Sequence, residues 1–592
     1  METTGEARRQ FLAYFSGLGL GATLLPGVLW AQVQEDAQHD EEQRVTPAML
    51  KDALALSGLS FPEEDQKAML QGVNRNLGNY EALRKIHIPN DVSPPFYFNP
   101  LVPGMKVNRL KEAQRFSMPG VKRPANLEDV AFWSITQLAQ LLRTRQVSSV
   151  DLTQMYLDRL HKYNAKLNCV VTFLDDVAMA QAKQADAEIA AGKYKGPLHG
   201  IPWGAKDIIT VRGYKTTWGS DAYKDQMLDN EASVVEMLRD AGAVLIAKLT
   251  SGELAQGDRW FGGTTKNPWN LSEGSSGSSA GPASATAGGC VAFGIGTETS
   301  GSILSPSARC GVTGLRPTFG RISRYGVMAL SWTQDRLGPL CRYAEDCAVV
   351  MSAIARPDGR DMSVSDIPFN WNVHLDIHKL RVGYLKDAFE ETKDAPLKRL
   401  DDKALEQVQA LGVKLIPVKV PDWNVDVTSI GVESAVFFDE LVRSGNDKKL
   451  TNPARANGFR ASRVVPAVEY LQSQRARAIM MAKLAEATAD VDVYLCPGIG
   501  GGPPPGGAAG GGRGRGADGP NPRRQSPTQR HFTMANLACY PAVAVPHGFS
   551  EAGTPSSITF YGRPFGEAEV LALAKAYQDA AGFHLKHPNL GS

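Results

Sequence analysis

The chain has 592 residues, of which 43% are hydrophobic and 21% are charged, a composition typical of globular proteins. Its formal net charge of +2 at pH 7 gives no indication of nucleic acid or an anionic membrane as a partner. The seven cysteines are scattered without a CxxC pair, and the ten histidines show no HExxH spacing. We therefore expect neither a disulfide framework nor a metal site.

Residues 1–31 carry the pattern of an export signal. Arg8-Arg9 precedes an apolar run, and the small residue Ala31 follows that run. The adjacent arginines resemble a twin-arginine signal, so we predict a periplasmic or secreted protein with no stable membrane association after cleavage. The alternative is an uncleaved anchor, although glycines and Pro26 interrupt a run that is barely long enough to span a bilayer.

The following residues, 32–127, comprise an acidic linker and a helical N-terminal extension with a proline-rich crossing. From residue 128 to residue 592, helical and strand-like segments alternate. This order predicts an α/β fold with a large mixed, mostly parallel twisted sheet covered by helices on both sides. Residues 499–528 are rich in glycine, proline and arginine, which predicts a disordered surface insertion. An alternative function for this segment is contact with RNA through its arginines. Such segments usually interleave aromatic residues with the arginines, and none is present here.

Two small-residue segments in the middle of the body carry the candidate chemistry. Residues 274–289 read GSSGSSAGPASATAGG. Besides a catalytic loop, a flexible linker or a phosphate-binding loop would have this composition. The tract lacks the GK[ST] ending of a phosphate loop and lies between two strand-like runs. The next segment, GIGTETSGSI, places Ser302 in a turn after a strand. Backbone N–H groups that converge in such a turn stabilise an oxyanion; the candidates are those of Thr299, Ser300, Gly301 and Ser302.

A serine nucleophile needs a base, and histidine is the usual one. No histidine stands in a motif here, whereas Lys206 lies inside the apolar run GIPWGAKDIITV. Burial favours the neutral amine of a lysine, which then accepts a proton. There are two alternatives: the Lys206 side chain reaches solvent, or it pairs with Asp207. Without other motifs in the sequence, these alternatives are the better interpretation of a single lysine.

Several motifs resemble, in order, those of the amidase signature family of Ser-cisSer-Lys hydrolases. They are GIPWGAKD, the Gly-Ser tract, GTETSGSI, CGVTGLRPTFGRIS and ANLACYPAVAVPHGF, and the similarity extends from about residue 130 to the C-terminus. The resemblance implies that Ser302 is the nucleophile, Ser278 the bridging serine with a cis peptide, and Lys206 the base. Ser278 lies at the family's usual separation of 24 residues from Ser302, unlike Ser275. No metal or organic cofactor is implied.

The sequence departs from the family pattern at three places: Ser300 for a glycine, Ser279–Pro282 for a double-glycine pattern, and Glu298 for an aspartate. These departures concern substrate preference more than activity. Asp335 is interpreted as a structural hydrogen-bond acceptor, and Arg309 and Arg316 as supports of the loop. Candidate pocket walls, each more often a core residue, are Trp203, Trp218, Trp260 and Phe261.

The resulting hypothesis is an amidase that hydrolyses a linear carboxamide, and also esters, through an acyl-enzyme on Ser302. Its expected partners are a small-molecule amide or ester and a second copy in a homo-oligomer, with no nucleic acid. The alternative is a transamidation subunit, because the family includes the A subunit of the glutamine-dependent tRNA amidotransferase. A third hypothesis is a binding protein that kept the fold without catalysis. The natural substrate stays open, since fold does not determine function.

Overall fold

The structure is a computed structural model that describes residues 44–84, 97–423, 427, 429–499 and 525–591. The predicted signal, 1–31, and most of the predicted insertion, 500–524, lie outside the described residues. The chain divides into two compact units, Met1–Pro89 and Asn90–Ser592. In the described ranges, the helices are all too short or too polar to cross a membrane.

The described part of the first unit, residues 44–84, contains two helices, α3 (Pro47–Leu56) and α4 (Glu63–Arg84). Thr46 caps α3, because its hydroxyl accepts a hydrogen bond from the Met49 N–H at 3.3 Å. Leu50 and Leu54, one helical turn apart, form a small core with Leu70 of α4. The unit therefore has a hydrophobic core of its own.

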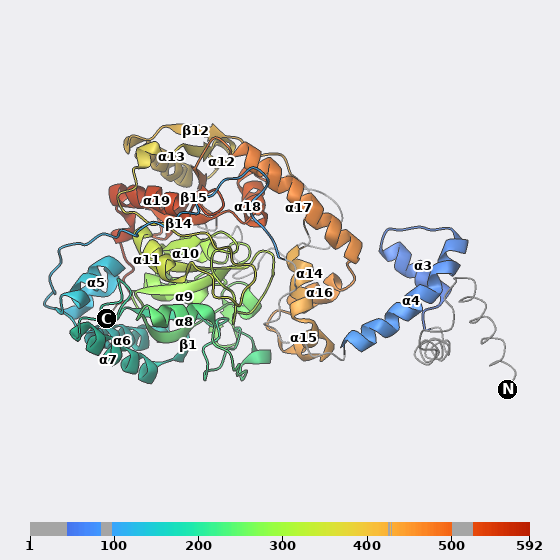
Figure 1. The fold of residues 1–592 in the computed structure, drawn as a ribbon, viewed down its shortest axis with the longest axis horizontal. Coiled ribbons are helices and arrows are strands. Elements are labelled where there is room, and N and C mark those ends of the chain that lie inside the picture. Colours follow the sequence, from blue (N-terminus) through green and yellow to red (C-terminus); the bar gives the residue numbers. More distant parts are fainter. Residues whose placement is uncertain (1–43, 85–96, 424–426, 428, 500–524, 592) are drawn as a thin grey trace, which may run out of the picture. The chain divides into compact units, whose positions relative to one another are not determined.

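The second unit is built on an 11-stranded sheet with the order β1-β3-β2-β8-β10-β9-β14-β15-β13-β11-β12 (Figure 1). Its strands are β1 (Val170–Phe173), β2 (Pro202–Lys206), β3 (Val244–Leu249), β8 (Phe293–Glu298), β9 (Thr313–Arg316), β10 (Arg336–Cys341), β11 (Val382–Leu385), β12 (Leu415–Val418), β13 (Val493–Pro497), β14 (Ala542–Phe549) and β15 (Pro555–Gly562). Two short hairpins lie outside this sheet: β4 (Arg259–Trp260) with β5 (Gly263–Thr264), and β6 (Lys266–Asn267) with β7 (Asn270–Gly274).

The predicted mixed sheet is confirmed, but its balance of directions differs from the expectation. Four neighbouring pairs are parallel, namely β2–β3, β2–β8, β11–β12 and β11–β13. The other six pairs are antiparallel. Antiparallel pairs therefore outnumber the parallel pairs that we expected to dominate. The reason is that some strands follow each other without a crossover helix, as β14 and β15 do across a short turn.

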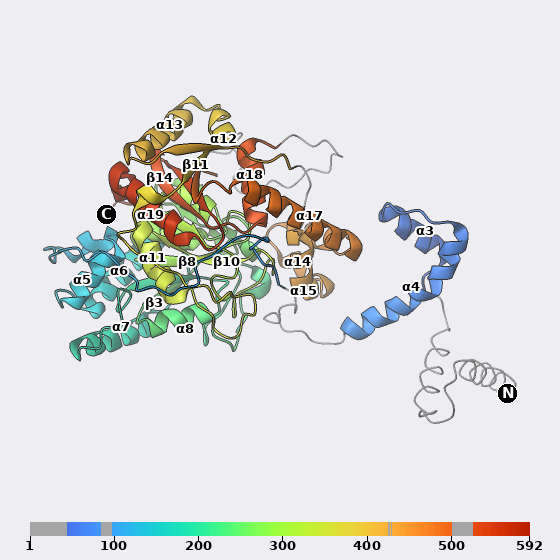
Figure 2. The ribbon, with the colours of Figure 1, turned by 45° about the horizontal axis from the view of Figure 1, so that its top comes forward.

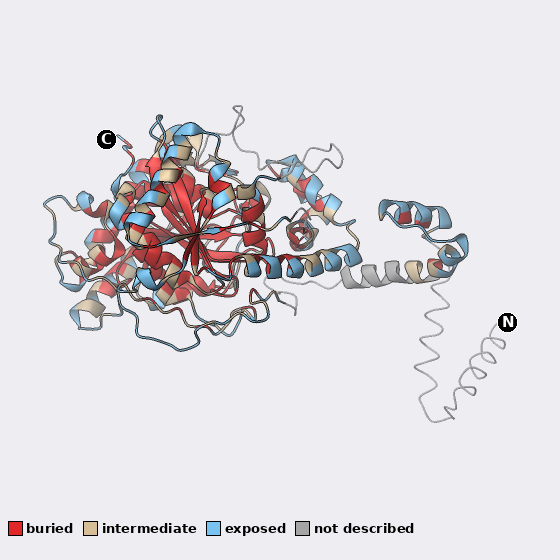
Figure 3. Cartoon of the chain, turned by 90° about the horizontal axis from the view of Figure 1, so that it is seen from above, coloured by how far each residue is buried: buried red, intermediate tan, exposed pale blue. Residues whose placement is uncertain are grey.

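Helices surround the sheet (Figures 2 and 3). They are α5 (Ile135–Arg143), α6 (Ser149–Leu167), α7 (Asp175–Ala190), α8 (Ser233–Asp240), α9 (Ala280–Ala287), α10 (Leu304–Cys310), α11 (Ala344–Ile354), α12 (Lys386–Glu390), α13 (Ala395–Ala410), α14 (Ser429–Phe437), α15 (Asp439–Arg443), α16 (Pro453–Ser462), α17 (Ala467–Ala487), α18 (Pro527–Leu537) and α19 (Glu567–Ala581). Ser134 and Gln137 form a capping box at the start of α5.

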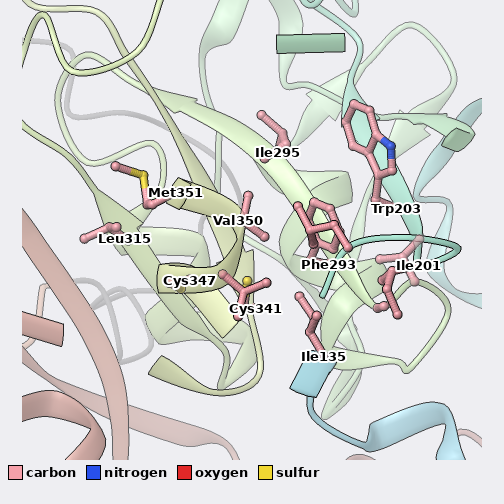
Figure 4. Close-up of a cluster of buried hydrophobic side chains, with 14 of the residues drawn as sticks. Ile135, Ile201, Trp203, Phe293, Ile295, Leu315, Cys341, Cys347, Val350 and Met351 are labelled. Atoms are coloured by element: carbon pink, nitrogen blue, oxygen red, sulfur yellow. The ribbon is translucent and has the colours of Figure 1, made fainter. Parts of the chain in front are cut away.

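Both faces of the sheet are covered, as alternate residues of β14 show. Val543 and Val545 belong to one hydrophobic cluster, whereas Ala542 and Ala544 belong to another. Because successive side chains of a strand point to opposite faces, a strand with buried residues in both clusters lies between two layers. Figure 4 shows part of the larger cluster, in which side chains of β2, β8 and α11 pack together.

Residues 97–127 belong to the second unit and pack on its body. The Phe98 ring meets Phe319 edge to face at 5.5 Å and lies under the Arg477 guanidinium at 3.9 Å. Further along, the Arg115 N–H donates to the Trp371 carbonyl at 2.9 Å. Residues 97–127 are thus attached to the sheet body through Phe98 and through Arg115.

Candidate active site

Lys206 is the last residue of β2, in the interior of the large sheet. β2 is parallel to β3 on one side and to β8 on the other, so the carboxyl ends of three strands meet at one edge. The register pairs Ala205 with Ile295, which brings Lys206 beside the end of β8. The Lys206 side chain has 0% exposure. An amine that reaches solvent is therefore excluded.

The alternative pairing of Lys206 with Asp207 is wrong. Asp207 forms a fully buried ion pair with Lys248, with Nζ and Oδ1 2.7 Å apart. The Asp207 carboxylate also accepts a hydrogen bond from the Thr217 N–H at 3.0 Å. The two neighbours in sequence are thus separated in space, because adjacent residues at a strand end point to opposite sides of the sheet.

Hydroxyl groups surround the Lys206 amine. Its Nζ donates to Ser278 Oγ at 2.7 Å and to Thr297 Oγ1 at 2.8 Å, and Ser279 Oγ lies at 3.3 Å. Within the described ranges, Lys206 has no carboxylate as an ion-pair partner at 4.0 Å or less. A buried ammonium would need such a partner, so this environment favours the neutral amine.

Burial lowers the pKa of Lys206 from 10.5 to about 7, while the carboxylates of Asp335 and Glu298 act in the opposite direction. Below about pH 7 the amine is protonated and has no lone pair to offer. Above that pH it is neutral and can accept a proton, which is what a general base must do.

Ser278 lies in the loop between β7 and α9, and the Gly277–Ser278 peptide is cis. Ser278 is the serine to which the resemblance assigns the cis peptide. A side chain at position 277 would place its Cβ 1.9 Å from the Gly257 carbonyl oxygen, so only glycine fits there. The Ser278 carbonyl accepts a hydrogen bond from the Gly252 N–H at 3.2 Å. Ser275 is not among the hydrogen-bond partners of the Lys206 amine; its hydroxyl donates to the carbonyl of the next residue.

Ser302 lies in the turn between β8 and α10 and is 9% exposed. The Ser279 N–H donates to the Ser302 carbonyl at 3.0 Å, which joins this turn to the loop that carries Ser278. Gly301 has φ +92°, and a Cβ added at this position would lie 3.1 Å from the Phe532 ring, so the turn needs glycine there. The Ser302 hydroxyl makes no hydrogen bond to any described residue. The bridge from Ser278 to Ser302 that the resemblance implies is therefore not formed in this structure.

The four predicted oxyanion donors occupy the same turn. The N–H groups of Ser300, Gly301 and Ser302 donate to no acceptor in the part of the chain that the structure describes. The Ser300 side chain, which replaces a glycine of the family pattern, is exposed. Ser300 thus adds a hydroxyl to the surface of the turn without entering the packed interior.

A buried carboxylate anchors the turn. Glu298 accepts hydrogen bonds from the N–H groups of Ile303 and Leu304 at 2.8 and 2.9 Å, and from Arg316 Nη1 at 3.0 Å. Burial by itself raises the pKa of Glu298, but the guanidinium groups of Arg316 and Arg336 and the two N–H groups hold it below its ordinary value. The glutamate therefore keeps the charge of the aspartate that it replaces in the family pattern.

Helix α18 is connected to this network through Asn536. The Asn536 Oδ1 atom accepts from Arg316 Nη1 at 2.8 Å and from Arg336 Nη2 at 3.3 Å. Arg336 Nη2 also donates to the Thr299 carbonyl at 2.8 Å. Arg316 is connected to the turn through the Glu298 carboxylate and not through a carbonyl of the turn, because its Nε and Nη2 atoms donate to the Tyr540 carbonyl.

Asp335 is a structural acceptor, as the sequence indicated. The Thr299 hydroxyl donates to its Oδ1 atom at 2.5 Å, and the N–H groups of Leu330 and Ser331 donate to its Oδ2 atom at 2.7 and 2.8 Å. Burial raises the pKa of Asp335, and these hydrogen bonds counteract part of that effect. The carboxylate thereby attaches the turn that carries Ser302 to the segment that precedes β10.

A cavity of about 230 Å³ adjoins the site and is lined by Thr297, Thr299 and Asp335. Tyr97, from the segment that precedes the main body, is part of its wall. The apolar part of the lining includes Ile208, Val327, Met328, Leu330, Trp332 and Leu337. In the described ranges, His, Cys, Asp and Glu side chains form no group of three that would hold a metal ion.

The tryptophans that the sequence offered as pocket walls are core residues. Trp203 stacks on a buried phenylalanine in the large cluster (Figure 4), and Trp218 packs against Phe437, the last residue of α14. Trp260 and Phe261 contact each other edge to face. None of these four lines the cavity, whereas Trp332 does. Local sequence held no signal for this difference, because it depends on which loop folds over the site.

Sequence reasoning missed Thr297 and Asn536. Thr297 lies on β8 next to its last residue, Glu298, so the period of two could have placed the Thr297 hydroxyl on the face opposite the carboxylate. Asn536 stands in the motif ANLACYP, which contributed to the resemblance but received no role. Its position becomes meaningful only when α18 packs against the turn.

Comparison with known proteins assigns the chain to a family. A sequence model of the family described as Amidase matches residues 151–571. The chain belongs to the amidase signature family. This amidase-family chain is 33% identical over 490 residues to the A subunit of the Glutamyl-tRNA(Gln) amidotransferase of Methylococcus capsulatus, a match that covers 77% of this chain and 98% of the relative. The corresponding protein of Geobacter metallireducens is 32% identical over 483 residues, with coverages of 76% and 98%.

Solved structures of amidases share the fold of this amidase-family chain. The native peptide amidase from Stenotrophomonas maltophilia superposes with a TM-score of 0.67 at 26% identity, over 78% of this chain and all of that protein. A chain from a vestigial complex related to an s-triazine catabolic enzyme gives a TM-score of 0.67 at 26% identity, over 75% and 98%. The α/β fold predicted from the sequence is therefore that of the amidases.

Proposed function

We propose that this amidase-family chain cleaves a carboxamide bond, and also esters, through an acyl-enzyme on Ser302. The observation that carries the proposal is the fully buried Lys206 amine, which lies 2.7 Å from Ser278 Oγ and has hydroxyls as its hydrogen-bond partners. A serine nucleophile requires a base, and a lysine whose pKa is near 7 supplies one without histidine.

In the proposed reaction, Ser302 Oγ attacks the carbonyl carbon of the substrate. The Ser302 proton passes to Ser278, whose own proton passes to the neutral Lys206 amine. The carbonyl oxygen becomes an oxyanion that the N–H groups of the turn 299–302 stabilise. Lys206 then returns its proton through Ser278 to the leaving nitrogen, the C–N bond breaks, and the acyl group stays on Ser302. Water attacks the acyl-enzyme by the same route and releases the acid.

The proposal requires one rearrangement. The Lys206–Ser278 hydrogen bond is present, but the Ser302 hydroxyl has no hydrogen bond to a described residue. Hydrogen bonds of a catalytic site are often incomplete before substrate binds and close in the complex. We therefore infer that Ser302 turns towards Ser278 when substrate occupies the adjoining cavity.

The fate of the released nitrogen separates two candidate functions. In hydrolysis the amine or ammonia leaves, as the similarity to the peptide amidase from Stenotrophomonas maltophilia favours. In transamidation it passes to a second acceptor, as the similarity to the Glutamyl-tRNA(Gln) amidotransferase relatives favours. Those relatives are the more similar in sequence, so transamidation is the better supported of the two by identity.

The deciding experiment compares the purified full chain with its Ser302→Ala variant on short aliphatic, aryl, long-acyl and peptide amides and on matching esters. Turnover that is lost in the variant supports the acyl-enzyme, and equal turnover by both proteins overturns it. Stoichiometric release of acid and ammonia by the chain alone supports hydrolysis. Release that depends on an added acceptor and a partner protein supports transamidation.

Export is a separate proposal that rests on the twin-arginine-like sequence at residues 1–31. It bears on the choice above, because a protein that modifies tRNA works in the cytoplasm. Cell fractionation with N-terminal sequencing of the mature protein tests it. A periplasmic protein that begins near residue 32 supports export and disfavours the transamidation alternative, whereas a cytoplasmic protein with an intact N-terminus contradicts export.

A further inference from the structure

The loop 252–258, between β3 and β4, is attached at both of its ends to the segment that carries Ser278. At one end, the Gly252 N–H donates to the Ser278 carbonyl at 3.2 Å. At the other end, the Asp258 carboxylate accepts a hydrogen bond from the Ser276 N–H at 3.0 Å. The position of the Ser278 backbone therefore depends on the conformation of this loop.

The middle of the loop has an unfavourable backbone conformation. Leu254 has φ +48° and Ala255 has φ +60°, in the left-handed region that residues with a side chain rarely adopt. Two such residues in succession raise the energy of the loop, so contacts from elsewhere in the fold must hold it. Ala255 also lines the cavity that adjoins the site.

Arg455 of α16 supplies such contacts from a distant part of the chain. Its Nη2 atom donates to the Leu254 carbonyl at 2.5 Å, and its Nη1 atom donates to Gln256 Oε1 at 3.1 Å. The two acceptors belong to the residues immediately before and after Ala255. Burial lowers the pKa of Arg455 to about 10, so the guanidinium is still protonated at neutral pH. Hydrogen bonds from a charged donor are among the strong ones.

The start of α16 is itself fixed against the same loop. The Glu253 carboxylate accepts hydrogen bonds from the Thr451 N–H at 2.9 Å and from the Thr451 hydroxyl at 2.7 Å. Leu254 and Phe459 of α16 belong to one hydrophobic cluster, and the Arg455 guanidinium lies 5.2 Å from the centre of the Phe459 ring. The packing of α16 thus places Arg455 where it reaches the backbone of the loop.

We propose that Arg455 is a positioning residue for Ser278. It holds the loop 252–258 in its left-handed conformation, and the loop in turn fixes the Ser278 backbone so that the Ser278 hydroxyl meets the Lys206 amine. The inference rests on the role of Ser278 in the proposed amide cleavage. It assigns a function to α16, which contributes no residue to the candidate triad or to the lining of the cavity.

The test measures the rate constant with which a small alkyl fluorophosphonate labels Ser302 in the full chain. Ser302 Oγ forms a bond to phosphorus, fluoride leaves, and the serine proton passes through Ser278 to the base, so labelling reports the relay without the natural substrate. We expect Arg455→Met to lower the rate constant about 10- to 100-fold, because two hydrogen bonds from a charged group are lost. Arg455→Lys keeps the charge without the planar fork, gives an intermediate rate, and serves if Arg455→Met does not fold.

A glycine at position 255 separates this role from a general effect on stability. Glycine adopts a positive φ without steric cost, so the loop of Ala255→Gly depends less on Arg455. We expect the loss caused by Arg455→Met to be at least about 5-fold smaller in Ala255→Gly than in the wild type. Arg477→Met is the matched control, because Arg477 is a buried arginine of α17 whose Nη2 donates to the Thr333 carbonyl at 2.9 Å, in another segment. Ala255→Gly should not reduce the loss caused by Arg477→Met.

Three results overturn the inference. They are labelling of Arg455→Met at the wild-type rate, an equal loss in the wild-type and Ala255→Gly backgrounds, and an equal rescue of Arg477→Met by Ala255→Gly. Circular dichroism of each variant gives the folded fraction by which the rates are divided. These results leave the acyl-enzyme proposal intact if the wild type is labelled at Ser302 and Ser302→Ala is not. A wild type that is not labelled at Ser302 removes the proposed function itself, so the two failures are distinguishable.

Discussion

The pKa of Lys206 predicts how the reaction rate depends on pH. With a pKa of about 7, half of the Lys206 amines are neutral at pH 7. A solvent-exposed lysine with a pKa of about 10.4 is neutral in only about one molecule in 2,500 at that pH. Because the neutral amine accepts the proton, we expect kcat/KM to rise with pH through about 7 and to become constant above it. A protonated lysine that acted as an acid would give the opposite slope.

Two substitutions of Lys206 examine this prediction. Lys206→Ala removes the base, and Lys206→Arg keeps a cation that cannot lose its proton at these pH values. We expect each variant to lower kcat by about 10²- to 10⁴-fold and to abolish the rise in rate near neutrality. A small primary amine added to Lys206→Ala should restore part of the rate, because the substitution leaves a space beside Ser278.

The measurement is kcat/KM of the full chain across acid, neutral and alkaline pH, with thermal unfolding at each pH as the control for stability. An unchanged pH profile in Lys206→Ala would refute the role of Lys206 as the base. A wild-type profile that is flat through neutrality and rises only near pH 10 would refute the buried, neutral amine while leaving other roles open.

Four further predictions concern the surroundings of the base. Ser278→Ala should lower kcat about 10²- to 10⁴-fold with little change in KM, as steady-state kinetics would show. Gly301→Ala, at φ +92° and against an aromatic ring, should lower kcat by displacing the turn; wild-type rates would contradict this. Arg316→Met should reduce the free energy of unfolding by about 3–5 kcal/mol in chemical denaturation, because it leaves Glu298 buried and unpaired. Tyr97→Ala should raise KM for bulky acyl groups but not for acetamide, since Tyr97 lines the cavity.

The local sequence predicted those features whose cause is local. The apolar neighbours of Lys206 indicate a buried strand, and the structure gives β2 at Pro202–Lys206. Small residues before Ser302 indicate a tight turn. The structure has such a turn, and the positive φ of Gly301 is a backbone conformation that glycine adopts readily. The alternation of helical and strand-like segments predicted the mixed α/β sheet correctly. It also led us to expect mostly parallel pairs, and that expectation was wrong.

Only the tertiary structure decided which groups meet. Lys206 and Asp207 are neighbours in sequence, yet Asp207 pairs with Lys248 of β3 and Lys206 meets Thr297 of β8. Asn536 contacts Arg316 and Arg336, behind the turn that carries Ser302, across 220 and 200 residues of sequence. Strand propensity and turn geometry are properties of a few consecutive residues, and the sequence determines them directly. Ion-pair partners, the pKa of a buried amine and the walls of a cavity depend on the packing of distant segments, and only the folded sheet brings those together.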